Sequence, residues 1–426
     1  MTSLGQRTVT LAYGSSGMPV QVPADATIIS PRHAPAAADP IGVLRRAVRE
    51  PVAGPPLRDL VRPGQRVAIA VCDVTRPQPR ALQLAAIAEV LDGVVRPEDV
   101  VVLIATGTHR SSTAEERLAM LGPEVIASWR VLDHDARDEA SLVDLGMVGD
   151  VPVRLAREWV EADLRITTGF VEPHFFAGFS GGPKMVAPGL AGLETVLALH
   201  NASRIADSRA TWGVTVGNPV HDAIRAIAAS TDVGFALDVL IDDRHRVTRA
   251  FAGEVLAMHA VACTAARDEA MQRVEAPFDV VITTNSGYPL DQNLYQAVKG
   301  MSAAAEVVAP GGTIVCAAEC RDGLPDHGTY ASLLASERSP AALMASILAR
   351  PETIPDQWQV QVQARVQAKA RVLLRADGLT DEQVRGAHLE PVDDVGETVA
   401  SLVAQRPGAR VCVLPQGPQT IPFLAA

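Results

Sequence analysis

The segment EPHFFAGFSGGPKMVAPGLAGLETVLALHN, residues 172–201, concentrates side chains that can do chemistry. These are His174, Gly181, Gly182, Lys184 and His200. Paired glycines let a backbone approach a ligand closely, and exposed backbone N–H groups can bind a phosphate. A lysine flanked by apolar residues is a candidate point of covalent attachment, because desolvation frees its amine. The alternative interpretation is a surface lysine that follows a turn.

The stretch FSGGPKM resembles a nucleotide-binding P-loop only superficially. A P-loop places its lysine directly after a glycine and follows it with a hydroxyl residue for magnesium. Here Pro183 separates Gly182 from Lys184, and Met185 carries no hydroxyl. We therefore interpret the stretch as a glycine turn suited to a phosphate rather than as a P-loop.

Two further histidine positions can serve acid/base chemistry. His109 and His174 each follow a predicted buried strand, and histidine titrates near neutral pH. Taken alone, each is equally compatible with a capping or core histidine, and His200 with a helix-terminal one. The remaining histidines that we weighed are assigned to the surface or to helices and are given no role; they are His221, His245 and His259.

Charged and polar residues elsewhere can bind an acidic ligand. Arg76, in DVTRP, can hold a carboxylate or a phosphate through its planar fork, and Asp73 can bind a ribose or orient Arg76. Tyr295, Gln296 and Lys299 lie at the start of a predicted helix, where residues four apart share a face. An ordinary amphipathic helix with a solvated Lys299 is the alternative.

The elements that must position these residues alternate between strands and helices. Residues 66–73, 99–110 and 163–174 are apolar runs that end in small or polar residues, which is typical of buried parallel strands. Open α/β sheets bind ligands at the carboxyl ends of their strands. The three loops that carry Arg76, His109 and His174 are therefore predicted to share one site.

A second alternating unit begins near residues 274–278. We predict two α/β domains with largely parallel sheets and an active-site cleft between them. The predicted domains are residues 1–274, which contain the candidate attachment lysine Lys184, and residues 275–426, which contain the candidate ligand-binding residues Tyr295, Gln296 and Lys299. A single long helix is predicted over 253–274, and the last residues, QTIPFLAA, are candidates to pack back on the first domain.

Composition excludes several classes of protein. The formal net charge is −11 and there is no basic run, which argues against a nucleic-acid partner. No apolar run approaches the roughly 18 residues of a membrane span, and the first residues lack the hydrophobic region of a signal peptide. The five cysteines form no CxxC pair. We expect a cytoplasmic protein with reduced thiols and no membrane partner.

Five separated motifs, taken together, resemble the nickel-pincer lactate racemase family. They are DVTRP (73–77), GTHR (107–110), EPHFFAGFSGGPK (172–184), LALH (197–200) and YQAVKG (295–300). They stand in the family's order across both predicted domains, so the resemblance covers essentially the whole chain. Five ordered motifs are far more specific than any one of them.

The resemblance implies a covalently attached cofactor. Lys184 would anchor pyridinium-3,5-bisthiocarboxylic acid mononucleotide, the nickel pincer nucleotide, and His200 would be the protein ligand of its nickel. Residues that would help to hold or line the cofactor are Asp73, Gly181, Gly182 and Trp358.

The resemblance also implies roles around the substrate. His109 and His174 would be paired acid/base residues, while Arg76 and Lys299 would bind the substrate carboxylate. Gln296 and Tyr295 would lie nearby as further substrate-binding residues.

The implied activity is that of an isomerase, a racemase or epimerase that inverts C2 of a 2-hydroxy acid. The substrate would be lactate or a larger relative, and inversion would proceed by proton-coupled hydride transfer through a 2-oxo acid. Two bases are needed because each enantiomer presents its hydroxyl on a different side. Pro183 stands where some lactate-acting members carry a basic residue, which leaves the substrate's side chain open.

The implied partners are a small 2-hydroxy acid and, in the cell, the enzymes that make the cofactor. Two alternatives stay open beside this function. One is a zinc-dependent hydrolase that uses His109, His174 and His200, although no HxxxH or HExxH spacing supports it. The other is a non-catalytic relative that binds the cofactor or a small anion.

Overall fold

The chain folds into two compact units, each built on a six-stranded sheet. The structure is a computed structural model that describes residues 5–32, 34–325 and 328–424. The unit that we call the middle unit contains the described residues of 33–200 and 207–269. The unit that we call the terminal unit contains the described residues of 1–32, 201–206 and 270–426.

The sheet of the middle unit has the strand order β13-β12-β9-β4-β5-β6. All neighbours are parallel except β13, which runs antiparallel to β12 at one edge. The bounds are β4 Val67–Cys72, β5 Val100–Ala105, β6 Arg130–Asp133, β9 Leu164–Phe170, β12 Phe235–Ile241 and β13 Val247–Gly253. Every residue of β4 is buried, as its continuous apolar run predicts for a central parallel strand.

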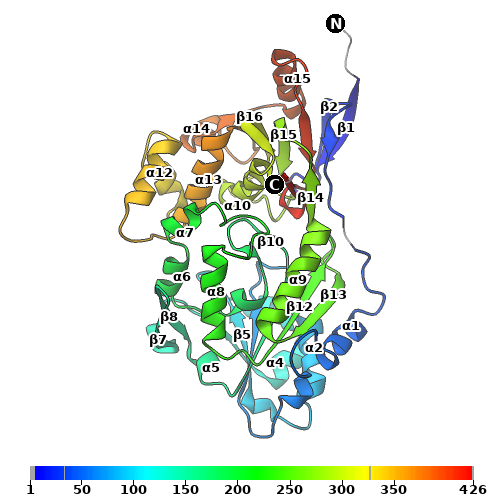
Figure 1. The fold of residues 1–426 in the computed structure, drawn as a ribbon, viewed down its shortest axis with the longest axis vertical. Helices are drawn as coiled ribbons and strands as arrows, with labels where there is room; N and C mark the ends of the chain where they lie inside the picture. Colours follow the sequence, from blue (N-terminus) through cyan, green and yellow to red (C-terminus); the bar gives the residue numbers. More distant parts are fainter. Residues whose placement is uncertain (1–4, 33, 326–327, 425–426) are drawn as a thin grey trace. The chain divides into compact units, whose positions relative to one another are not determined.

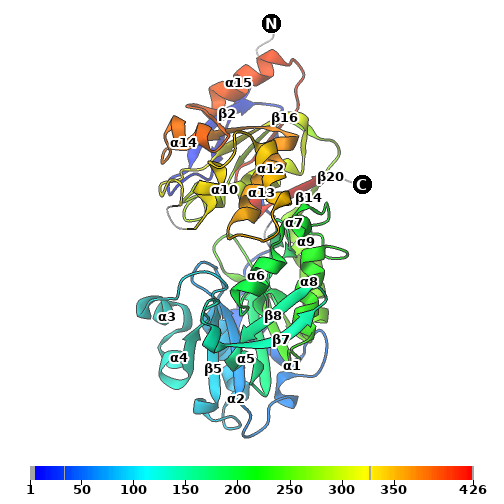
Figure 2. The ribbon, with the colours of Figure 1, turned by 90° about the vertical axis from the view of Figure 1, so that its left-hand side faces the viewer.

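Helices and two small hairpins complete the middle unit. The helices are α1 Pro40–Arg49, α2 Arg80–Leu91, α3 Ala114–Leu121, α4 Pro123–Ser128, α5 Arg157–Val160, α6 Leu193–Leu199, α8 Pro219–Ala229 and α9 Val255–Ala270. The hairpins pair β7 Leu142–Val148 with β8 Val151–Ala156, and β10 Pro173–His174 with β11 Gly178–Phe179. Helices α8 and α9 lie side by side, as Figures 1 and 2 show, and their histidine rings stack.

The terminal unit has a fully parallel sheet in the order β18-β17-β16-β15-β19-β3. Its strands are β3 Thr27–Ile28, β15 Phe278–Thr284, β16 Val308–Ala317, β17 Arg371–Arg375, β18 Glu390–Pro391 and β19 Val411–Leu414, with a hairpin of β1 Gln6–Leu11 and β2 Met18–Pro23. Its helices are α7 Ala202–Ala206, α10 Leu294–Ala305, α11 Tyr330–Leu334, α12 Pro340–Ala349, α13 Gln357–Lys369, α14 Asp381–Gly386 and α15 Val395–Gln405. The predicted fold class, α/β with largely parallel sheets, is confirmed.

The units divide the chain differently from the predicted domains 1–274 and 275–426. Residues 5–32 join the terminal unit, because β3 pairs in parallel with β19. Residues 201–206 join it too, and Gln361 of α13 donates to the carbonyl of Ala202 at 2.7 Å. Both contacts link segments far apart in sequence, and no local pattern indicates them.

The predicted helix over 253–274 is wrong at its end. Helix α9 stops at Ala270, and β14 (Met271–Val274) follows as a strand. Its partner is β20 (Ile421–Leu424), so the chain's last described residues pair with 271–274 inside the terminal unit. Within the described residues, no helix is both long enough and apolar enough to cross a membrane.

Candidate active site

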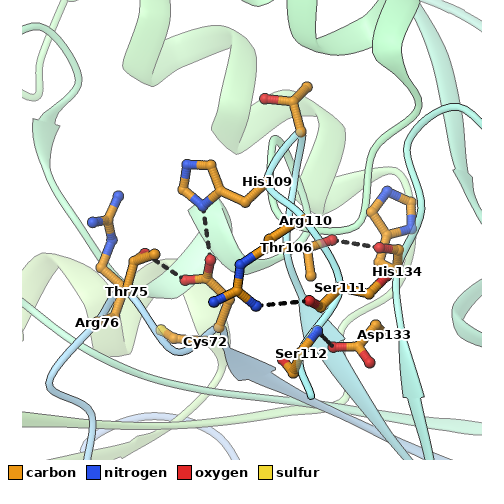
Figure 3. A network of polar contacts seen from close by, with 12 residues as sticks. Cys72, Thr75, Arg76, Thr106, His109, Arg110, Ser111, Ser112, Asp133 and His134 are labelled. Atoms are coloured by element: carbon orange, nitrogen blue, oxygen red, sulfur yellow. Dashed lines mark hydrogen bonds and ion pairs between the residues drawn. The ribbon is translucent and has the colours of Figure 1, made fainter. Parts of the chain in front are cut away.

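The ends of β4 and β5 bring Asp73 and His109 together. The carboxylate oxygen Oδ2 of Asp73 lies 2.7 Å from Nδ1 of His109. Figure 3 shows a dashed line for this contact at the ring of His109. A carboxylate only accepts, so Nδ1 carries the hydrogen and the lone pair of the neutral ring lies on Nε2. The Asp73 side chain is 6% exposed, whereas that of His109 is 49% exposed. A buried carboxylate thus orients a histidine that reaches outward.

Two opposing effects act on Asp73. Burial raises the pKa of its carboxyl. Hydrogen bonds from His109 and Thr75 and the charge of Arg76 lower the pKa by more than burial raises it, so the net pKa lies below the ordinary value. Asp73 is therefore ionised at neutral pH. The contact with His109 was not expected from the sequence, and the roles of Asp73 toward a ribose or Arg76 stay predictions.

A buried polar network that sequence reasoning missed holds the loop after β4. The guanidinium of Arg80 donates to the carbonyls of Cys72 at 2.7 Å and Arg76 at 2.8 Å, and also to that of Asp73. Gln78 accepts from the Cys72 N–H at 2.7 Å, which closes the same loop from within. These contacts fix the backbone on which Asp73 and Arg76 are displayed.

His174 lies in the short hairpin of β10 and β11, and its Nδ1 is an acceptor. The backbone N–H of Ala177 donates to Nδ1 at 3.2 Å, with Phe176 N–H more distant at 3.5 Å. The neutral ring therefore carries its hydrogen on Nε2. The ring stacks on Phe175 at 4.9 Å and meets the edge of Phe176 at 4.6 Å between centroids.

His200 caps the C-terminal end of α6 and is 8% exposed. Its Nδ1 donates to the carbonyl of Val196 at 2.7 Å, which leaves the ring's lone pair on Nε2. Burial lowers the pKa of His200 to about 4, and the nearby charge of Lys184 adds to this effect. The imidazole is thus neutral at pH 7, the form in which histidine binds metals. Its ring centroid lies 5.3 Å from that of Phe176, which also touches His174.

The glycine turn before Lys184 packs tightly onto protein beneath it. Gly181 and Gly182 have positive φ angles of 74° and 49°. A Cβ on Gly181 would lie 2.7 Å from Asp238 Oδ2, and one on Gly182 would lie 2.5 Å from the ring of His259. The glycines are therefore required by packing as well as by backbone conformation. Lys184 follows, half-buried, in the 3₁₀ turn Gly182–Met185.

Three buried groups of the middle unit support this turn from below. Asp238 accepts from the Gly182 N–H at 2.6 Å, His259 Nε2 donates to the Ser180 carbonyl at 2.8 Å, and His221 Nδ1 donates to the Ala177 carbonyl at 3.1 Å. Burial raises the pKa of Asp238 to about 7 and lowers that of His259 to about 3 and that of His221 to about 4. His221 and His259 lie on helices, as one of the two predicted assignments has it, but neither lies at the surface, and both bind the loop although no role was predicted for them.

The terminal unit brings its four predicted residues together on α10 and α13. Lys299 Nζ donates to Gln296 Oε1 at 2.7 Å, one turn apart on α10. The indole Nε1 of Trp358 donates to the hydroxyl of Tyr295 at 3.2 Å. Asn293 caps the helix by accepting from the Gln296 N–H at 3.0 Å. That this group faces the middle unit across a cleft stays a prediction.

Comparison with known proteins gives these residues a context. Two family models match the chain, the lactate racemase N-terminal domain over residues 13–213 and the lactate racemase C-terminal domain over residues 273–421.

The chain belongs to the lactate racemase family.

Relatives in this family are similar along most of their length. The lactate racemase of Thermoanaerobacterium thermosaccharolyticum is 35% identical over 387 residues, 89% of each chain. That of Lactiplantibacillus plantarum is 33% identical over 381 residues, 88% of this chain and 89% of the relative. The solved structure of the Thermoanaerobacterium apoprotein matches with a TM-score of 0.91 and 31% identity, over 99% of this chain and 100% of that one. The chain is accordingly an enzyme, a racemase of the isomerase class.

A compositional signal points to the same family residues. Only three of the 38 basic residues are lysines, Lys184, Lys299 and Lys369, and the others are arginines. Two of these three, Lys184 and Lys299, are predicted site residues. By contrast, among the described residues no three His, Cys, Asp or Glu side chains form a group that could hold a metal ion, as the zinc-hydrolase alternative requires.

Proposed function

We propose that this chain is a nickel-dependent racemase that inverts C2 of a 2-hydroxy acid, with a pincer mononucleotide attached to Lys184. The relatives' names favour lactate as the substrate. The observation that carries the proposal is His200, a buried and neutral imidazole whose Nδ1 donates to the carbonyl of Val196, which leaves on Nε2 the lone pair that a metal would bind. The positive charge of Lys184 acts on the same ring, so the attachment and ligand positions are neighbours.

The residues present fit such a cofactor. A single neutral histidine suits a nickel whose remaining ligands belong to the cofactor, and histidine nitrogen is a common ligand for nickel. Lys184 follows a glycine turn, and an amine there can condense with a thiocarboxylic acid group to a thioamide, with loss of water. When bound, the cofactor supplies an acceptor for the C2 hydrogen as hydride and a donor for its return.

His109 is the base for one enantiomer in this proposal. Its Nε2 bears the lone pair because Nδ1 donates to Asp73. When Nε2 takes the proton of the C2 hydroxyl, the imidazolium that forms lies 2.7 Å from the Asp73 carboxylate, which stabilises it. Loss of this proton makes the C2 hydrogen easier to remove as hydride, and the substrate becomes a planar 2-oxo acid.

His174 serves the opposite side of the substrate. As an imidazolium it returns a proton to the C2 oxygen, and as a neutral ring it takes the proton from the second enantiomer. The flanking rings of Phe175 and Phe176 restrict water around it. Arg76 and Lys299 hold the substrate carboxylate while the carbonyl turns between the two histidines.

The decisive experiment measures attachment and metal in the loaded protein. Protein produced together with the cofactor's biosynthetic enzymes is expected to carry one nickel and one mass adduct, which peptide mapping places on Lys184. Lys184→Ala is expected to lose the adduct, and Lys369→Arg is the matched control that keeps it. A wild-type protein with neither adduct nor nickel, or an adduct that survives Lys184→Ala, would sink the proposal.

The loaded wild-type protein is also expected to racemise enantiopure lactate. A panel of other enantiopure 2-hydroxy acids, followed by optical rotation, then ranks the substrates. Loaded protein that inverts none of them contradicts the proposed activity, even if the adduct is present.

A further inference from the structure

A chain of buried hydrogen bonds runs from the start of α8 to the ring of His174. The side-chain oxygen of Asn218 accepts from the N–H groups of Val220 and His221, at 3.0 and 3.2 Å, and so caps α8. The side-chain NH₂ of Asn218 donates to the carbonyl of Phe176 at 2.9 Å. The same peptide group, between Phe176 and Ala177, presents its N–H to Nδ1 of His174 at 3.2 Å.

All donors in this chain point in one direction. The amides of the α8 N-terminus donate to Asn218, Asn218 donates to the peptide, and the peptide donates to His174. Aligned hydrogen bonds polarise one another, and a helix N-terminus adds partial positive charge at their origin. The end of the chain is Nδ1 of His174, which is thereby held as an acceptor.

Asn218 is well suited to set this direction. It is fully buried, and its four hydrogen-bonding positions are filled, since the NH₂ group also donates to the Val214 carbonyl at 2.9 Å. His221, on the first turn of α8, donates to the Ala177 carbonyl and fixes the adjoining peptide. Rotating the Phe176–Ala177 peptide would leave buried polar groups unpaired, which costs free energy.

We propose that Asn218 is a positioning residue that holds His174, in the resting site, as the neutral tautomer with its hydrogen on Nε2. This inference rests on the proposed function, which gives His174 its acid/base role. In this tautomer His174 donates a hydrogen bond to the C2 oxygen. To take a proton from the second enantiomer, His174 must first lose the hydrogen on Nε2 and carry it on Nδ1 instead. Nδ1 then no longer accepts from the Ala177 N–H, so that hydrogen bond must break. The two histidines of the site are therefore unequal bases at rest.

The tautomer can be read directly in the apoprotein. Two-bond ¹H–¹⁵N spectra of histidine-labelled protein distinguish hydrogen on Nδ1 from hydrogen on Nε2, and His174→Gln assigns the signal. Wild-type His174 is expected on Nε2. Asn218→Ser keeps a side-chain oxygen for the helix cap but loses the NH₂ donor, and it is expected to show mixed tautomers. The control Asp39→Ala removes another helix cap of the middle unit, where Asp39 accepts from the Gly42 N–H, and is expected to leave the His174 signal unchanged.

A second variant tests the same contact without touching Asn218. Replacing the amide of Ala177 by an ester removes the N–H that faces His174 and also weakens the Phe176 carbonyl as an acceptor, and it is expected to shift the tautomer in the same way. A wild-type His174 with hydrogen on Nδ1 overturns the inference, as does a signal that neither Asn218→Ser nor the ester changes. Failure of loaded wild-type protein to racemise any 2-hydroxy acid would instead contradict the proposed function, because the tautomer is measured without cofactor.

Discussion

The two histidines expected to share the chemistry follow strands of one sheet, yet their surroundings are opposite. His109 lies after β5, is half-exposed, and donates a hydrogen bond from Nδ1 to the carboxylate of Asp73. His174 lies after β9, is flanked by aromatic rings, and receives a backbone N–H at the same ring position. A carboxylate stabilises the imidazolium, whereas an N–H donor stabilises the neutral ring.

The two loops also rest on unlike carboxylates. Asp73 has His109, Arg76 and Thr75 around it, and its net pKa is lowered. Asp238, beneath the glycine turn, has only the Gly182 N–H among the described residues, its Oδ1 is unpaired, and burial raises its pKa to about 7. One site loop thus rests on a carboxylate whose pKa is lowered by its neighbours, and the other on a carboxyl whose pKa is raised by burial, although both loops carry a site histidine.

Removing His109 or His174 is expected to have the largest effect on activity. In loaded protein, His109→Ala and His174→Ala are each expected to slow complete inversion by about 10²- to 10⁴-fold, the usual contribution of a general acid or base. In a single turnover, each variant should still form 2-oxo acid from one enantiomer, and the two variants should prefer opposite enantiomers. Rapid quench with chiral analysis measures this, and a shared preference would contradict the assignment of one histidine to each side.

The two enantiomers of lactate have equal free energies, so kcat/KM must be equal in both directions. A difference between His109 and His174 as bases can therefore appear only in the separate values of kcat and KM for the two enantiomers. We expect kcat to be lower for the enantiomer that uses His174 as its base.

The two carboxylates should respond to pH with opposite signs. Asp238 has a folded-state pKa raised from 3.8 to about 7, so its contribution to stability is full below pH 4 and is lost as the pH rises through 7. Asp238→Asn lacks this loss, and its stability relative to wild type should increase by roughly 4 kcal/mol from pH 4 to pH 8, at about 1.36 kcal/mol for each pKa unit. Urea unfolding of the apoprotein measures the difference.

Asp73 is the control for that experiment. Its folded-state pKa is lowered, so its contribution is present above the ordinary carboxyl range and is lost as the pH falls below it. Asp73→Asn should therefore become less destabilising, relative to wild type, only in acid. Parallel pH slopes for the two variants would show that the carboxylates are not held differently.

The sequence predicts the first loop better than the second. Continuous apolar runs identify β4 and β5, and parallel strands present their carboxyl ends at one edge, so the pattern alone places the loops that carry Asp73 and His109 close together. It does not predict that these two side chains contact each other. The supports of His174 come from α8, α9 and β12, which no local pattern connects to residues 176–182. One signal was available, because a single aspartate within the buried strand FALDVLI is costly unless it binds something.

The division of the chain shows the same limit. Alternating strands and helices predict two α/β units, and the structure contains them. The assignment of residues 5–32 and 201–206 depends on β3 pairing with β19 and on α13 binding α7. Such pairings depend on burial in the folded chain rather than on local propensity, so hydrophobic periodicity in the sequence does not predict them.

The smallest expected effect tests whether Asp73 sets the direction of His109. In Asp73→Asn the amide can donate to Nδ1, which would move the ring's hydrogen to Nε2 and give His109 the tautomer now found at His174. Because His109 is half-exposed and can reorient, we expect kcat/KM to fall by only about tenfold to a hundredfold, less than loss of the imidazole itself. Asp133→Asn is the matched control, since Asp133 is a buried carboxylate that ends β6 and pairs with Arg117 instead of a histidine. Equal losses in both variants would mean that Asp73 supports the fold alone. A loss confined to Asp73→Asn, with His109 shifted to the Nε2 tautomer in the two-bond spectra, would show that Asp73 sets the tautomer in which His109 acts as a base.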